Sequence, residues 1–180
     1  STMLDQVYKR VALKAVKLPS LRDYKLTWKT ILRSSGIGSF IGILPAEGGT
    51  VASLIGYSEA KRWSKKPEEF GKGSIEGIAG AEAANNAATG GAMVPTLALG
   101  IPGSATTAVI LTGLIIHGVR PGPDLFREQP EFLYGIFGSM IIANVLFFIF
   151  GFFGAKLFAR ITLVPNKILW PMIFAVSVCG

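Results

Sequence analysis

Two apolar stretches of the sequence are each interrupted by glycine and proline beside hydroxyl side chains. The first interruption, residues 42–50, contains Pro45, and the second, residues 99–107, contains Pro102. A helix broken inside a membrane exposes N–H groups that attract anions at one new end and carbonyls that attract cations at the other. Secondary transporters bind substrates and ions at paired breaks of this kind. Proline and glycine also kink packed helices without binding anything, and this alternative stays open.

A further group of polar residues lies between the two interruptions. Glu82, Asn85 and Asn86 stand in a stretch made otherwise of small side chains. Adjacent amides supply donors for carboxylate oxygens and acceptors for a cation. Glu47 and Glu82 are acidic residues in or near apolar segments, and ionisable residues within a membrane are functional-site candidates by default. Helix–helix hydrogen bonding or capping would also explain the amides, and an interfacial position would explain the glutamates.

Other kinds of site have little support in the sequence. One cysteine and one histidine among 180 residues exclude a disulfide framework and a histidine-rich metal centre. The run Gly71-Lys72-Gly73 lacks the spacing of a phosphate-binding loop. An intramembrane enzyme would need a nucleophile within reach of a base, and no such pair can be nominated. We therefore expect neither an enzyme nor a bound cofactor.

The composition is typical of an integral membrane protein. Half of the residues are apolar, only 16% are charged, and the mean hydropathy is +0.48, whereas soluble domains carry roughly 25% charged residues. The net charge of +7 comes from basic residues that flank the apolar segments, as the positive-inside rule describes for cytoplasmic loops. That distribution argues against nucleic-acid binding and for a polytopic, all-α helical bundle in a lipid bilayer.

The first part of the chain predicts a surface segment followed by a hairpin. Residues 1–33 are basic and amphipathic, and we expect them at the cytoplasmic membrane surface, with a solvated linker helix as the alternative. Residues 34–57 are apolar apart from Glu47, and both flanks are basic. A segment of this length crosses a bilayer only once as a straight helix. We favour a re-entrant hairpin that turns near residues 45–49, with a simple spanning helix as the alternative.

The middle of the chain predicts a helix and then a broken helix. Residues 74–91 are rich in alanine and glycine, which favour helix and close packing in membranes. Residues 92–118 are long enough to cross, but Pro95 and Pro102 interrupt them, which predicts a discontinuous membrane helix. The following residues, 119–132, lack a basic excess and should lie outside the cytoplasm.

The last part of the chain predicts further membrane segments. Residues 133–155 form the clearest spanning helix, and residues 168–180 begin the next span. The sequence is still apolar where it stops, so we expect it to be a piece of a longer protein.

Three motifs resemble the large membrane subunit of the tripartite tricarboxylate transporters, the TctA family. They are FGKGSIEGIAGAEAANNAA at residues 70–88, PTLALGIPGSATTA at residues 95–108 and HGVRPGP at residues 117–123. The resemblance extends from about Leu18 to the last residue. It is to the opening part of the second half of that subunit, which implies one half of an internal repeat.

The resemblance implies a function as well as a fold. It implies a multi-pass protein of the bacterial inner membrane that takes up di- or tricarboxylates such as citrate. Its partners would be a small four-helix membrane subunit and a periplasmic solute-binding protein, and a sodium or proton gradient rather than ATP would drive uptake. The alternative is a non-transporting membrane scaffold whose glycine and proline motifs serve helix packing.

Together these observations define two expected sites. The substrate site combines backbone N–H groups, hydroxyls and amides of Asn85, Asn86, Pro102, Gly103, Ser104, Ala105, Thr106 and Thr107. The ion-coupling site combines carboxylates with backbone carbonyls, which would hold a sodium ion, and consists of Pro45, Glu47, Gly48, Gly49, Thr50 and Glu82.

The first interruption departs from the pattern of that family. The usual run after the leucine is Pro-Gly-x-Gly-x-Thr, and here Ala46 and Glu47 follow Pro45. Alanine adopts a positive φ less readily than glycine, and Glu47 adds negative charge where an anionic substrate would approach. A cationic or neutral substrate, or a proton carried by Glu47, is therefore an alternative.

Overall fold

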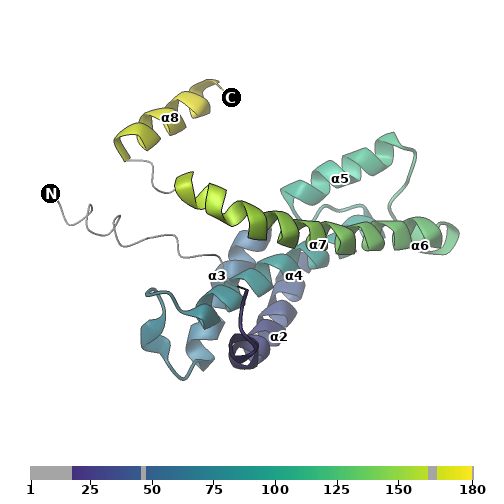
Figure 1. The fold of residues 1–180 in the computed structure, drawn as a ribbon. Coiled ribbons are helices and arrows are strands. Elements are labelled where there is room, and N and C mark those ends of the chain that lie inside the picture. The colour runs from purple at the N-terminus through teal and green to yellow at the C-terminus, as the bar shows by residue number, and fades with distance from the viewer. Residues whose placement is uncertain (1–17, 46–47, 162–165, 180) are drawn as a thin grey trace. The chain divides into compact units, whose positions relative to one another are not determined.

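The protein is helical throughout the part that the structure describes. The computed structural model describes residues 18–45, 48–161 and 166–179, and their regular structure is all helix. The chain divides into a compact unit, Pro19–Gly135, and a second unit that begins at Ile136. Figure 1 labels the helices in order. The expected all-α fold class is confirmed for these residues, whereas the predicted site residue Glu47 and residues 1–17 lie outside them.

The first interruption separates two helices. Helix α2, Leu21–Ile43, begins with a capping box, because the Ser20 side chain accepts the Asp23 N–H and Asp23 in turn accepts the Ser20 N–H. Hydrogen bonds from the side chain and backbone of Ser20 hold the pKa of the Asp23 carboxyl below its usual value. Helix α3 is Gly48–Trp63. The break between α2 and α3 therefore falls at the predicted turn.

The second interruption follows one long helix, α4, Ile75–Leu99. We expected a boundary between residues 91 and 92 and a break at Pro95, and both predictions are wrong because α4 continues through Pro95 to Leu99. A proline removes one backbone donor, whereas a residue in the left-handed conformation redirects the chain. Gly100 has φ 67° and ends the helix, and its N–H donates to the Pro95 carbonyl.

Helices α2 and α4 lie side by side and run parallel. A Cβ atom on Gly38 would collide with the main chain of Ala84, and one on Gly42 would collide with that of Ala88. Both residue numbers increase together, so the two helices run in the same direction. Their backbones therefore approach closely with almost no side chain between them, as small residues permit in membrane helices.

Helix α3 packs against the same pair and runs antiparallel to α4 (Figure 1). A Cβ atom on Gly56 would lie 2.5 Å from the Gly80 carbonyl oxygen, and one on Gly49 would collide with the Asn85 side chain. Residue numbers rise along α3, from Gly49 to Gly56, while those of their contacts fall along α4, so these two helices are antiparallel. A small core of buried residues joins the three helices: Ile41, Ala52, Ala84 and Ala88.

The chain after α4 forms a long loop that contains helix α5, Ala105–Ile116, and returns to the end of α4. Helix α5 leaves the end of α4, and the chain then returns, so that the Gly122 N–H donates to the Leu97 carbonyl at 2.9 Å. Residues 100–121 therefore lead away from the C-terminal end of α4 and return to that same end. The short helix α6, Pro123–Glu128, follows.

The remaining helices are short or strongly apolar. A 3₁₀ turn, η1, Pro67–Glu69, lies between α3 and α4. Helix α7, Pro130–Ile161, is followed by α8, Asn166–Cys179. Among the described residues, only Pro130–Ala155 is both long and apolar enough to span a membrane by itself. This helix contains the predicted span at 133–155.

Candidate functional site along helix α4

The first break lies against a predicted site residue of α4. The Asn85 side-chain oxygen contacts the position that a Cβ atom on Gly49 would occupy. Gly49 is in the first turn of α3, where backbone N–H groups lack carbonyl partners. Asn85 itself is exposed. The structure therefore brings Asn85 to the N-terminal end of α3, beside the α2–α3 break.

The second break folds back onto the same helix. A Cβ atom on Gly103 would lie 2.8 Å from the Ala92 Cα, so glycine permits this close approach. The Gly103 N–H donates to the Thr96 hydroxyl at 3.3 Å, and that hydroxyl donates to the Ala92 carbonyl at 2.7 Å. Thr96 is completely buried. A single hydroxyl therefore anchors the glycine–proline loop to α4.

The two breaks lie on one face of α4. Asn85 and Ala92 are seven residues apart, so they share a face and are separated by ~10 Å along the axis. Glu82 and Thr89 follow the same three- and four-residue spacing and are exposed. This face therefore carries the Thr89 hydroxyl between the two breaks, the Asn85 amide beside the first break and the Glu82 carboxylate about one turn before it.

The first turn of α5 uses several of the predicted donors internally. The Ser104 N–H donates to the Thr107 hydroxyl at 2.9 Å, and the Thr107 N–H donates to the Ser104 hydroxyl at 3.2 Å. The Gly103 N–H is bonded to Thr96. Of the predicted N–H groups of Gly103, Ser104 and Ala105, that of Ala105 is therefore left to meet a ligand. The Thr106 N–H belongs to the same first turn, whose N–H groups lack carbonyl partners within the helix. Both residues are exposed.

Other predicted residues lie apart from this face. Asn86 is exposed and lies about 100° around α4 from Asn85, turned away from α2 and α3. Pro45 and Thr50 are exposed at the α2–α3 break, and Gly48 has a positive φ of 58°. Pro102 is half-buried in the second loop.

Four polar residues with notable positions or contacts were not among the predicted site residues. Thr89 continues the polar face, and its spacing of four residues from Asn85 was the available signal. The Glu76 carboxylate accepts hydrogen bonds from Thr30 at 3.0 Å and from Ser64 at 2.7 Å. This contact joins α2, α4 and the chain after α3, and nothing in the spacing of residues so far apart could have indicated it.

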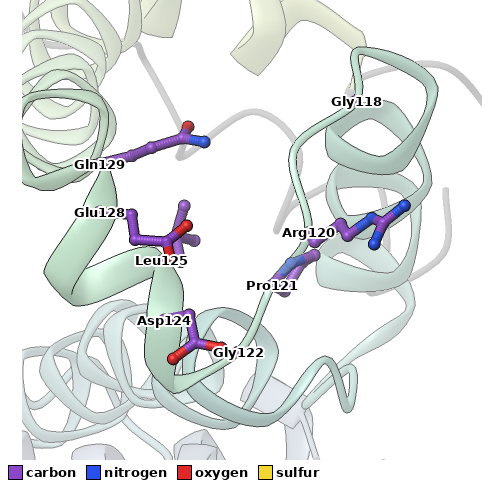
Figure 2. A pocket seen from close by; sticks show the side chains of 8 residues that line it. All are labelled: Gly118, Arg120, Pro121, Gly122, Asp124, Leu125, Glu128 and Gln129. Carbon is purple, nitrogen blue, oxygen red and sulfur yellow. The ribbon is translucent and has the colours of Figure 1, made fainter.

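A pocket elsewhere in the unit has a different character. It has a volume of about 300 Å³ and lies between α6 and residues 118–122. Figure 2 shows Glu128 and Gln129 extending into it and Arg120 extending away. A lining that includes Asp124 and Glu128 is unsuited to a carboxylate. The described residues also contain no cluster of three or more side chains that could hold a metal ion.

An all-helical fold in the described residues, with one helix long and apolar enough to span a membrane, indicates a helical membrane protein. Comparison with known families makes this specific: residues 2–180 match the tripartite tricarboxylate transporter TctA family. The chain belongs to that family, as its motifs indicated.

Two relatives come from Agrobacterium vitis. One is an uncharacterized 52.8 kDa protein in the TAR-I ttuC' 3' region, 39% identical over 89% of this chain and 32% of its own length. The other is an uncharacterized protein in the TAR-II ttuC' 3' region, 41% identical over 79% of this chain and 59% of its own length. The chain thus spans about one third and three fifths of these relatives. No solved structure matches it.

Proposed function

We propose that the protein of which this chain is a part takes up di- or tricarboxylates across the bacterial inner membrane, coupled to a sodium or proton gradient. It would work with a small four-helix membrane subunit and a periplasmic solute-binding protein. Membership of the TctA family supports the transporter role. The observation that carries the site is the position of both helix breaks on one face of α4.

The proposed substrate site lies between those breaks. Its donor groups are the Asn85 amide, the Thr106 hydroxyl and the N–H groups of Ala105 and Thr106. The Thr89 hydroxyl lies beside them and donates to the Asn85 carbonyl at 3.4 Å. Amide and hydroxyl donors and the positive end of a helix all favour carboxylate oxygens. Thr107 and Ser104 would act indirectly, by capping α5 and holding its first turn in place. Asn86 belongs to the edge of the site at most.

The proposed coupling ion lies at the first break. The C-terminal end of α2 and the N-terminal end of α3 meet there. Carbonyls at the end of α2 carry partial negative charge, which suits a cation. Glu82 faces the same side of α4 and would add a full negative charge. In the alternative, the coupling ion is a proton that binds to Glu47.

We further propose that α2 and α3 form a re-entrant hairpin open to the cytoplasm. The Arg33 guanidinium, in the middle of α2, lies 5.1 Å from the centre of the Trp63 ring at the C-terminal end of α3. The basic part of α2 and the basic end of α3 therefore lie side by side. Beyond Arg33, α2 rises about 15 Å, and α3 is about 24 Å long. Neither arm reaches across the roughly 30 Å hydrocarbon core.

Uptake measurements on paired amide variants test the substrate site. The complete transporter would be reconstituted in vesicles with its binding protein, and carboxylate uptake would be measured with and without a sodium or proton gradient. Asn85→Ala should reduce uptake at least tenfold, since a lost charge-assisted hydrogen bond costs roughly 1.5 to 3 kcal/mol. Asn86→Ala is the matched control and should retain most activity.

The outcomes separate the proposals. Equal uptake by Asn85→Ala and the unaltered protein would remove the α4 face from the site while leaving transport intact. Failure of the intact complex to move any carboxylate under either gradient would favour the membrane-scaffold alternative.

A further inference from the structure

Helix α2 carries a stripe of cations on its surface. Arg22, Lys25, Lys29 and Arg33 are spaced by three, four and four residues, so they share one side of the helix. The opposite side of α2, which includes Thr30, Ser34 and Gly38, is buried. Arg22, Lys25 and Lys29 are exposed and face away from the helix packing, whereas Arg33 is half-buried beside Trp63 of α3.

Large apolar side chains lie directly beside this stripe. Leu21 is 82% exposed, Trp28 51% and Leu32 64%. The Lys29 ammonium lies 5.5 Å from the centre of the Trp28 ring. A surface that combines exposed apolar groups with cations is typical of segments lying at a membrane interface.

The stripe has no carboxylate partners in the described part of the chain. The ion pairs found there join Arg62 to Glu59 and Lys66 to Glu69. Because no described carboxylate lies within 4.0 Å of the stripe cations, the described part of this unit does not neutralise their positive charge. Anions from outside are therefore the natural counter-charge.

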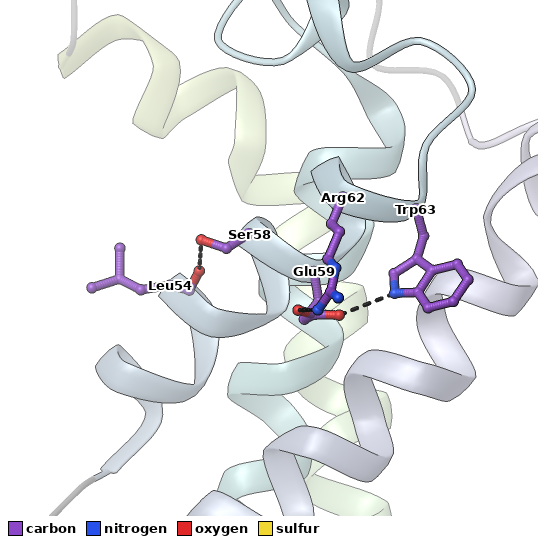
Figure 3. Close-up of polar contacts among 5 residues, drawn as sticks. All are labelled: Leu54, Ser58, Glu59, Arg62 and Trp63. Carbon is purple, nitrogen blue, oxygen red and sulfur yellow. Dashed lines mark hydrogen bonds and ion pairs between the residues drawn. The ribbon is translucent and has the colours of Figure 1, made fainter.

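The end of α3 adds to the same region. In Figure 3 the Arg62 and Trp63 side chains both donate to the Glu59 carboxylate, at 3.3 and 3.1 Å. These bonds hold the Trp63 ring where Arg33 lies over it, and Trp63 remains 62% exposed. Lys66 is paired with Glu69, whose hydrogen bond raises the pKa of Lys66, against an opposing effect of nearby Arg22.

We propose that the stripe of α2, together with Trp28 and Trp63, binds the headgroups of anionic phospholipids. The phosphate groups would lie on the lysine and arginine side chains, and the acyl chains would lie on the apolar side chains beside them. Charge complementarity selects this occupant, because the exposed cations have no carboxylate partner among the described residues and lie beside apolar groups that a soluble anion would leave in water.

Lipid retention by the intact large subunit tests the proposal. The purified subunit would be exposed to mixed micelles of phosphatidylglycerol and phosphatidylcholine, and bound lipids would be counted by native mass spectrometry. Lys25→Gln with Lys29→Gln should weaken phosphatidylglycerol binding by roughly fivefold per lysine, while phosphatidylcholine binding stays unchanged. Arg120→Gln with Arg127→Gln removes the same charge elsewhere and should have no such effect.

Two further measurements distinguish other occupants. Brominated phosphatidylglycerol should quench tryptophan fluorescence more than brominated phosphatidylcholine, and Trp28→Phe should reduce that difference. Unchanged lipid selectivity in the double lysine variant would overturn the proposal. So would displacement of the lipid by free glycerol phosphate at equal concentration, which would indicate a soluble anion, or preferential binding of a short RNA duplex.

Discussion

At the residue scale, hydroxyl side chains of one type have different tasks. Thr96 is buried and joins the second loop to α4, and Thr107 is buried and caps α5 together with Ser104. Thr106 is exposed at the first turn of α5. The adjacent threonines of the motif therefore separate into a structural hydroxyl and one free to meet a ligand.

This difference predicts opposite effects of two neighbouring substitutions. Thr107→Val removes the acceptor of the Ser104 N–H, and leaving such a group without a partner costs roughly 1 to 3 kcal/mol. Thr106→Val removes an exposed hydroxyl and should change stability by less than about 0.5 kcal/mol. We expect Thr107→Val to lower the melting temperature of the purified subunit. Thr106→Val should reduce carboxylate uptake and leave the melting temperature unchanged.

The pair also carries its own control, because valine preserves the size and branching of threonine. Normal stability of Thr107→Val would contradict the capping role. Normal uptake by Thr106→Val would remove that hydroxyl from the proposed site.

At the element scale, the contact between α2 and α4 is made largely by main chain. A Cβ atom on Gly91 would collide with the Ser39 carbonyl and lie 3.1 Å from the Gly42 Cα. Neither contact belongs to a flexible side chain that could move aside. By contrast, Gly90 has nothing within 4 Å of its Cβ position. These adjacent glycines thus meet very different surroundings.

Alanine substitution at the two glycines should therefore have opposite effects on stability. Gly91→Ala forces α2 and α4 apart, and overpacking of this kind costs typically about 1 to 3 kcal/mol. Gly90→Ala should be neutral or stabilise by roughly 0.5 to 1 kcal/mol, because alanine favours helix over glycine. Thermal unfolding of the two variants in the same detergent measures the difference.

Equal melting temperatures for Gly91→Ala and Gly90→Ala would show that the close approach of α2 and α4 does not limit stability. A loss of stability in both variants would point instead to a shared need for glycine in α4.

Local sequence signals predicted the breaks but not their partners. The first turn was expected near residues 45–49 from Pro45 and its glycines, and α3 begins within that range, at Gly48. Pro95 was misleading, because a helix tolerates one missing donor near its end while Gly100 determines where it stops. The contacts of Gly49 with Asn85 and of Gly103 with Ala92 depend on packing between segments distant in sequence, which periodicity does not encode.

At the scale of the whole molecule, the basic and non-basic connections lie at opposite ends of α4. The residues before α4 include Lys61, Lys65 and Lys66, whereas residues 119–132 have no basic excess. With 25 residues, α4 is about 37 Å long, which exceeds the roughly 30 Å hydrocarbon core. A crossing by α4 would therefore put these connections on opposite sides of the membrane.

Cysteine labelling tests this topology. In a Cys179→Ser background, which removes the one cysteine of this chain, Lys65→Cys should react with a membrane-impermeant maleimide only from the cytoplasmic side. Glu128→Cys should react only from the opposite side. Both expectations follow from the positive-inside rule. Labelling of both positions from one side would contradict a crossing by α4.

The contact between α2 and α4 also bears on how related sequences can diverge. Where two backbones touch, compensation between side chains is impossible, since a larger group on one helix cannot be matched by a smaller group on its neighbour. Gly38, Gly42 and Gly91 should therefore remain small across relatives. Outward-facing positions such as Leu32 and Val94 should drift among apolar types, leaving a record of the interface in the pattern of change.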